Sequence, residues 1–139
     1  MPVFTIETTY RLPVYRHQTV EAPTVEAACR LAIADDDWEK AKFDYESAGE
    51  TYVTGAWCGA EVAYRGNAER WPAQFDELVQ RKAGHFDELL AILRMPARKM
   101  GLSQLEFARW LPKALAAVAK ADAILAGGPD PEVETRAAE

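Results

Sequence analysis

Two kinds of hydrophobic periodicity divide the chain. From Phe4 to Leu12, apolar and β-branched residues alternate with polar ones, and this period of two predicts a half-buried β-strand. Pro13 interrupts the pattern, and a second strand is predicted over residues 14–22. Two further strands are predicted over residues 38–46 and 51–58, separated by a turn in which Gly49 can take a positive φ. We expect this second pair of strands to form a hairpin.

A helical period appears between these strand pairs. Thr24 is the predicted N-cap of a helix that ends near Asp35. The apolar residues of this segment have the spacing of one helix face: Val25, Ala28, Cys29, Ala32 and Ile33. The first half of the chain, residues 1–66, therefore predicts a ββαββ arrangement. The simplest way to bury it is a four-stranded antiparallel sheet with one covering helix.

The second half, residues 67–126, is predicted to contain two or three helices. Helical spacing runs from Phe75 to Leu93 and predicts one long amphipathic helix, which Pro96 ends or kinks. Ser103 and Glu106 form a capping-box pattern that opens the next helix. Pro112 is expected to end that helix or open another, which stops at residues 127–129. We thus expect one α+β domain over residues 1–126 and a mobile acidic tail over residues 127–139.

Composition narrows the classes of function. The 139 residues carry a formal net charge of −6, and an acidic chain is a poor non-specific binder of nucleic acid. No run of about 18 apolar residues occurs, so no membrane span is predicted. The start of the chain does not resemble a signal peptide, which favours a cytoplasmic location. In the cytoplasm, Cys29 and Cys58 are expected to stay reduced. The sequence does not predict whether the two cysteines lie close together.

Candidate chemistry is sparse. Three consecutive carboxylates at residues 35–37 cannot all turn toward one cation, so a solvated corner is the better interpretation. His17 and His85 lack a second ligand at zinc spacing, and no phosphate-binding loop or nucleophile motif occurs. We predict no catalytic, metal or cofactor-binding residues and no cofactor, and therefore a protein that is not an enzyme. A small enzyme with an unrecognised site stays as an alternative.

One local pattern resembles a known family. Leu93-Arg94, followed six residues later by the segment from Gly101 to Leu111, resembles the first two helices of phage-repressor-type helix-turn-helix proteins. The resemblance implies a DNA-binding regulator using residues 93–126, with Ser103 and Gln104 near the phosphates. The sequence departs from that family's pattern at Pro96 and after Leu111, where mostly alanine stands in place of a polar recognition helix.

Aromatic residues favour another function. Four tryptophans and five tyrosines are many for a small α+β core, and both types serve as anchors at protein interfaces. Trp71 and Trp110 flank the helical half and are the candidate interface residues. We therefore predict a non-enzymatic protein-interaction factor, such as an adaptor, inhibitor or accessory protein. It is expected to act through a protein partner or through self-association. Neither a nucleic acid nor a membrane is the expected partner.

Overall fold

The computed structural model of the protein describes residues 1–131, and the fold is of the α+β class, as predicted. Small antiparallel sheets and one short helix come first, and two long helices follow. Two compact units are present: one comprises residues 1–9 together with the chain from residue 52 onward, and the other comprises residues 10–51. Most of the acidic tail predicted over residues 127–139 lies outside the described residues.

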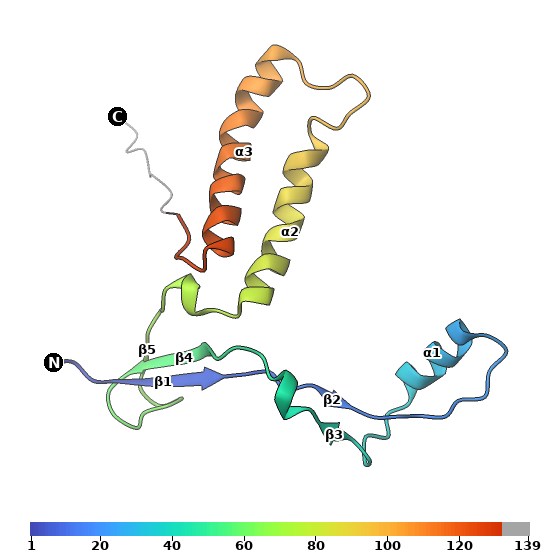
Figure 1. The fold of residues 1–139 in the computed structure, drawn as a ribbon. Coiled ribbons are helices and arrows are strands. Elements are labelled where there is room, and N and C mark those ends of the chain that lie inside the picture. The colour runs from blue at the N-terminus through green and yellow to red at the C-terminus, as the bar shows by residue number, and fades with distance from the viewer. Residues whose placement is uncertain (132–139) are drawn as a thin grey trace. The chain divides into compact units, whose positions relative to one another are not determined.

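The sheet of the first unit has three strands, in the order β1-β4-β5 (Figure 1). Strand β1 (Phe4–Thr9) pairs antiparallel with β4 (Tyr52–Cys58), which pairs antiparallel with β5 (Asn67–Ala68). Glu7 lies opposite Gly55 and Thr8 lies opposite Val53, so Thr54 is the extra residue of a bulge. The prediction of one four-stranded sheet is therefore wrong, because the two other strands of the chain's first half form a separate sheet.

The second unit contains that smaller sheet. Strand β2 (Val14–Tyr15) pairs with β3 (Lys42–Phe43), and both are much shorter than the predicted strands over residues 14–22 and 38–46. The expected hairpin between residues 38–46 and 51–58 does not form. The Asp44 carboxylate accepts hydrogen bonds from the amides of Glu46 and Ser47 and turns the chain into a short 3₁₀ helix, η1 (Tyr45–Ser47). This turn separates β3 from β4, and each strand pairs with an earlier one.

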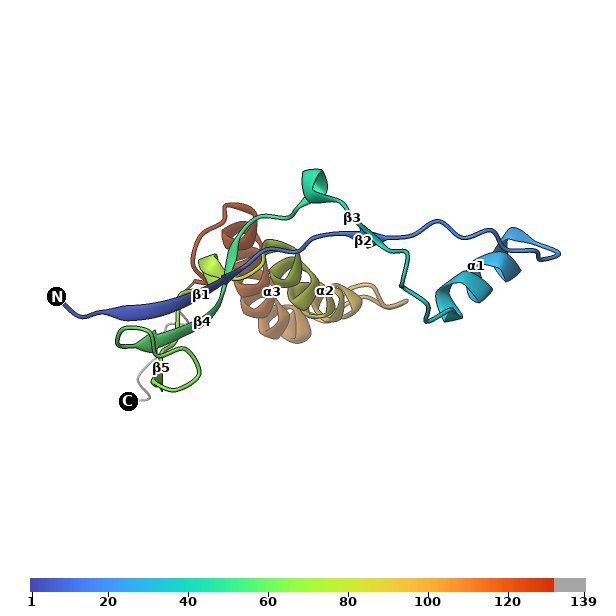
Figure 2. The same cartoon turned by 90° about the horizontal axis from the view of Figure 1, so that it is seen from below.

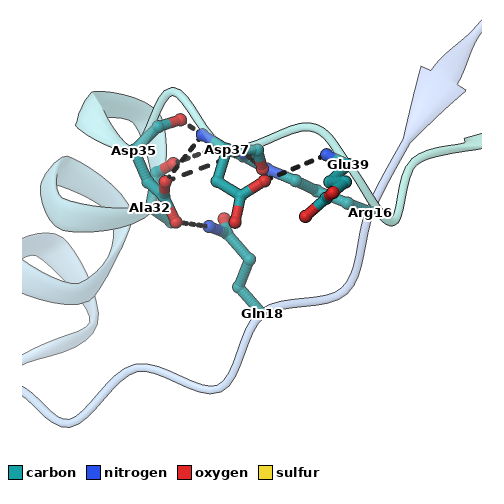
Figure 3. A network of polar contacts seen from close by, with 6 residues as sticks. All are labelled: Arg16, Gln18, Ala32, Asp35, Asp37 and Glu39. Atoms are coloured by element: carbon teal, nitrogen blue, oxygen red, sulfur yellow. Dashed lines mark hydrogen bonds and ion pairs between the residues drawn. The ribbon is translucent and has the colours of Figure 1, made fainter.

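Helix α1 (Val25–Ala34) also belongs to the second unit and begins as predicted, with the Thr24 hydroxyl accepting from the Ala27 amide (3.1 Å). None of its residues is buried, so it is not the covering helix that the sequence predicted. Its C-terminal end is held by Arg16 (Figure 3). The Arg16 guanidinium donates to the carbonyls of Ala32, Asp35 and Asp37 and lies 4.0 Å from the centre of the Trp38 ring.

The C-terminal part of the first unit is a pair of antiparallel helices that lie side by side (Figures 1 and 2). Helix α2 (Leu78–Arg94) begins three residues later than predicted, because residues 73–75 form a short 3₁₀ helix, η2 (Ala73–Phe75). Helix α3 (Gln104–Leu125) starts with the predicted capping box between Ser103 and Glu106. No helix within residues 1–131 combines the length and apolarity that crossing a bilayer requires.

Helix α3 corrects one expectation: Pro112 lies inside it and neither ends it nor starts another. An interior proline lacks an amide hydrogen and is unfavourable in a helix by about 3 kcal/mol. Packing against α2 on both sides of the proline offsets this cost. Before it, the Trp110 indole donates to the Ile92 carbonyl (2.8 Å); after it, Ala114 and Ala117 are buried.

Candidate functional site

The α2–α3 pair has a regular antiparallel register, which is set by two hydrogen bonds. The His85 Nε2 atom lies 2.8 Å from the Ala117 carbonyl oxygen, and seven residues further along α2 the Ile92 carbonyl accepts from Trp110. Each step toward the end of α2 is therefore matched by one step back along α3. This register determines which side chains of the two helices lie at the same level.

His85 is the one buried polar residue of the described chain. Its Nδ1 atom lies 3.0 Å from the Glu88 carboxylate, which is also 3.7 Å from the Lys120 ammonium. The two ring nitrogens thus lie against a backbone carbonyl and a carboxylate. Both nitrogens are thus occupied by the hairpin itself, and the ring serves to join α2 to α3.

Large apolar side chains on both helices remain exposed despite this packing. On α2 they recur every seventh residue, at Val79, Phe86 and Leu93, and Phe86 is 63% exposed. On α3 the same seven-residue spacing recurs, and these residues are also exposed: Leu111, Val118 and Leu125. A seven-residue repeat of apolar positions is typical of a helix surface that packs against another helix.

The two stripes lie on the same side of the helix pair. A shallow pocket of about 180 Å³ lies between the helices on that side, lined by Lys82, His85, Leu89, Ala121, Ile124 and Leu125. Lys82 and Leu89 neighbour the α2 stripe, and Leu125 belongs to the α3 stripe, so the pocket connects them. We call the two stripes together the hairpin face: Val79, Phe86 and Leu93 with Leu111, Val118 and Leu125.

A second organised cluster lies on the three-stranded sheet. The Glu7 carboxylate accepts from the hydroxyls of Thr54 (2.5 Å) and Tyr64, and the Tyr64 ring packs on Trp57 with ring centres 4.9 Å apart. Tyr64 has φ +63°, a conformation that side-chain-bearing residues rarely adopt. Glu61, in the same loop between β4 and β5, is a second non-glycine residue with a positive φ.

These hydrogen bonds also shift the pKa values of Glu7 and Tyr64. Hydrogen bonds from Thr54 and then Tyr64 hold the pKa of the Glu7 carboxyl below its usual 4.5. The hydrogen bond to Glu7 raises the pKa of Tyr64 above 10.0. Glu7 is therefore a weaker base and Tyr64 a weaker acid than usual, which suits a structural clasp for the loop better than proton transfer.

The acidic corner at residues 35–37 is used for local turns. One oxygen of Asp35 accepts from the Asp37 amide (2.9 Å), and the other accepts from the Gln18 side chain (2.6 Å). Asp37 in turn accepts from the Glu39 amide (Figure 3). Among residues 1–131, no three His, Cys, Asp or Glu side chains are grouped as metal ligands are.

The predicted interface tryptophans both donate hydrogen bonds within the chain. The Trp71 indole donates to the Asp76 carboxylate (2.8 Å), and the half-buried Trp110 donates to the Ile92 carbonyl and packs on Phe107. Their interface role stays a prediction. The structure adds the hairpin face, which our sequence analysis did not identify. The seven-residue spacing was the signal, but the register that aligns the two stripes comes from the tertiary contacts.

The candidate DNA contacts lie at the start of α3. Ser103 is the N-cap and accepts from the Glu106 amide (3.2 Å), and Gln104 is the first helical residue. The resemblance to a helix-turn-helix requires a turn and a further helix after Leu111, and α3 instead continues to Leu125. The structure therefore has one helix where the resemblance implies two. DNA binding itself stays a prediction.

Both cysteines, Cys29 and Cys58, are free and exposed thiols. Comparison of the chain with protein-family models, with curated proteins and with solved structures finds no match.

Proposed function

We propose that the protein is a non-enzymatic interaction factor that binds another polypeptide through the hairpin face. Exposed apolar area supports the proposal. The six side chains of the face, with the adjoining Leu89, Phe107 and Leu115, expose apolar surface on the order of 900 Å². The largest apolar patch on a typical monomer is about 300–600 Å².

The area also matches what a specific contact needs. A standard protein–protein interface buries about 800 Å² on each partner. The spacing of the exposed residues favours a helical surface as the partner, since seven-residue repeats interlock with the side chains of another helix. We include in the proposal a cytoplasmic location, which the free thiols favour.

The alternative functions have less support. For DNA binding, the basic link before α3 offers Arg98, but its guanidinium is paired with Glu106 at 3.0 Å. For catalysis, the Glu7–Tyr64 cluster has its acid and its hydroxyl bonded to each other. The six side chains of the hairpin face, in contrast, are exposed.

Site-specific photocrosslinking tests the proposal. A photoreactive phenylalanine analogue replaces Phe86 in the full chain, expressed in its native host, and crosslinked products are identified by mass spectrometry. Leu105 is the matched control, because it is 62% exposed but lies more than about 100° around α3 from the stripe. We expect an intermolecular product from position 86 and little or none from position 105.

Two results would contradict the proposal. One is the absence of any intermolecular product from position 86. The other is a product in which position 86 is joined to a strand of its own chain, since this shows that the face is part of the protein's own core.

A further inference from the structure

We infer that the partner of the hairpin face is a second copy of this chain, and that two hairpins assemble face to face into a four-helix bundle. This inference rests on the proposed function and names its partner. Two observations support it: the levels of the apolar residues and the area of the face.

The apolar residues of the two stripes lie at three common levels. His85 is level with Ala117 and the helices run in opposite directions, so Phe86 and Val118 lie about 3 Å apart along the helix axes. The seven-residue spacing gives the same small offset between Val79 and Leu125 and between Leu93 and Leu111. Two such faces brought together form three layers of four side chains each, which is the core pattern of a four-helix bundle.

Small residues between the layers allow the helices to approach. Ala114 lies between the levels of Leu111 and Val118, and Ala121 lies between those of Val118 and Leu125. On α2 the corresponding position between Phe86 and Leu93 is Leu89, which is only 36% exposed. Large and small residues thus alternate along α3, as they do in interlocking helix pairs.

The area is also sufficient for a dimer. On the order of 900 Å² of apolar surface per copy reaches the per-partner area of a standard interface, and it is more apolar than most, as homodimer interfaces are. A single seven-residue stripe on one helix would not give this area. The aligned pair of stripes does.

Sedimentation equilibrium of the full chain measures the association directly. At about 50 μM we expect twice the 15.5 kDa mass of the chain. Phe86→Asp places a charge in the middle layer of both copies and should weaken self-association by about 100-fold or more. Leu105→Asp, at equal exposure off the face, should leave it unchanged, and circular dichroism confirms that both variants keep their helices.

The outcomes separate this inference from the function on which it rests. A wild type that stays monomeric at about 50 μM while position 86 crosslinks to a different protein overturns the dimer and leaves the interaction function standing. A monomer whose position 86 gives no intermolecular product overturns both. Dimers that tolerate Phe86→Asp show that self-association uses another surface and overturn the inference.

Discussion

Replacing Arg16 by alanine should unfold helix α1 without unfolding the rest of the protein. The helix has ten residues, none of them buried, and isolated helices of this length are marginal in water. Its last carbonyls have no partners within the helix, and the Arg16 guanidinium supplies donors to those of Ala32 and Asp35. The Arg16 side chain is only 9% exposed, and its bond to the Ala32 carbonyl is partly buried.

The size of the effect follows from the contacts. Hydrogen bonds from a charged donor contribute about 1 kcal/mol or more each, and the stacking of the guanidinium on Trp38 adds about 0.5–1 kcal/mol. The total is about 3 kcal/mol of local stability. Since about 1.4 kcal/mol corresponds to a factor of ten, amide hydrogen exchange in α1 should become roughly 100-fold faster.

Hydrogen exchange followed by NMR or mass spectrometry measures this change residue by residue. Arg30→Ala is the matched control, because its ion pair with Glu26 on the same helix is about three-quarters exposed and contributes about 0.3–0.5 kcal/mol. Exchange in α2 and α3 should be unaffected by either variant. Unchanged protection of α1 in Arg16→Ala would refute the reasoning, because the helix would then be stable without the arginine.

Two further predictions concern the three-stranded sheet. Gly55→Ala should destabilise the protein by about 1–3 kcal/mol in denaturant titration, because a Cβ atom there would lie 2.2 Å from the Trp57 ring; a change near zero means that the ring moves aside freely. Glu7→Gln should make the stability of the protein depend less on pH under acidic conditions. The lowered pKa of Glu7 stabilises the fold above about pH 4.5, and this stabilisation is lost as the pH falls through the folded-state pKa. Thermal midpoints measured between about pH 3 and pH 6 should therefore drop more steeply in the wild type than in the variant, and parallel profiles would contradict this assignment.

Much of the helical structure was predictable because its signals are local. The Thr24 and Ser103 caps each bond to an amide three residues away, and both were read correctly from the sequence. The end of α1 near Asp35 was also predicted, although the role of Arg16 was not. That contact joins residues about twenty positions apart, and no pattern in the intervening segment indicates it.

The hairpin face was not predicted from the sequence. Apolar and aromatic content indicated an interaction protein, but the residues chosen, Trp71 and Trp110, both bond within the chain. The exposed residues at the centre of the hairpin face are Phe86 and Val118. Sequence spacing places each on a helix stripe, but it does not show whether a stripe faces its neighbour helix or away from it.

The sequence by itself thus determined the α+β class, the caps and the approximate helices, because these depend on bonds between residues a few positions apart. The tertiary structure decided which strands pair, that α3 continues through Pro112, and that two apolar stripes lie on one side of the hairpin. These outcomes depend on contacts between distant residues, such as Glu7 with Tyr64 and His85 with Ala117. Periodicity shows that a strand or helix has an apolar face, but the partner of that face is selected by the packing of the whole chain.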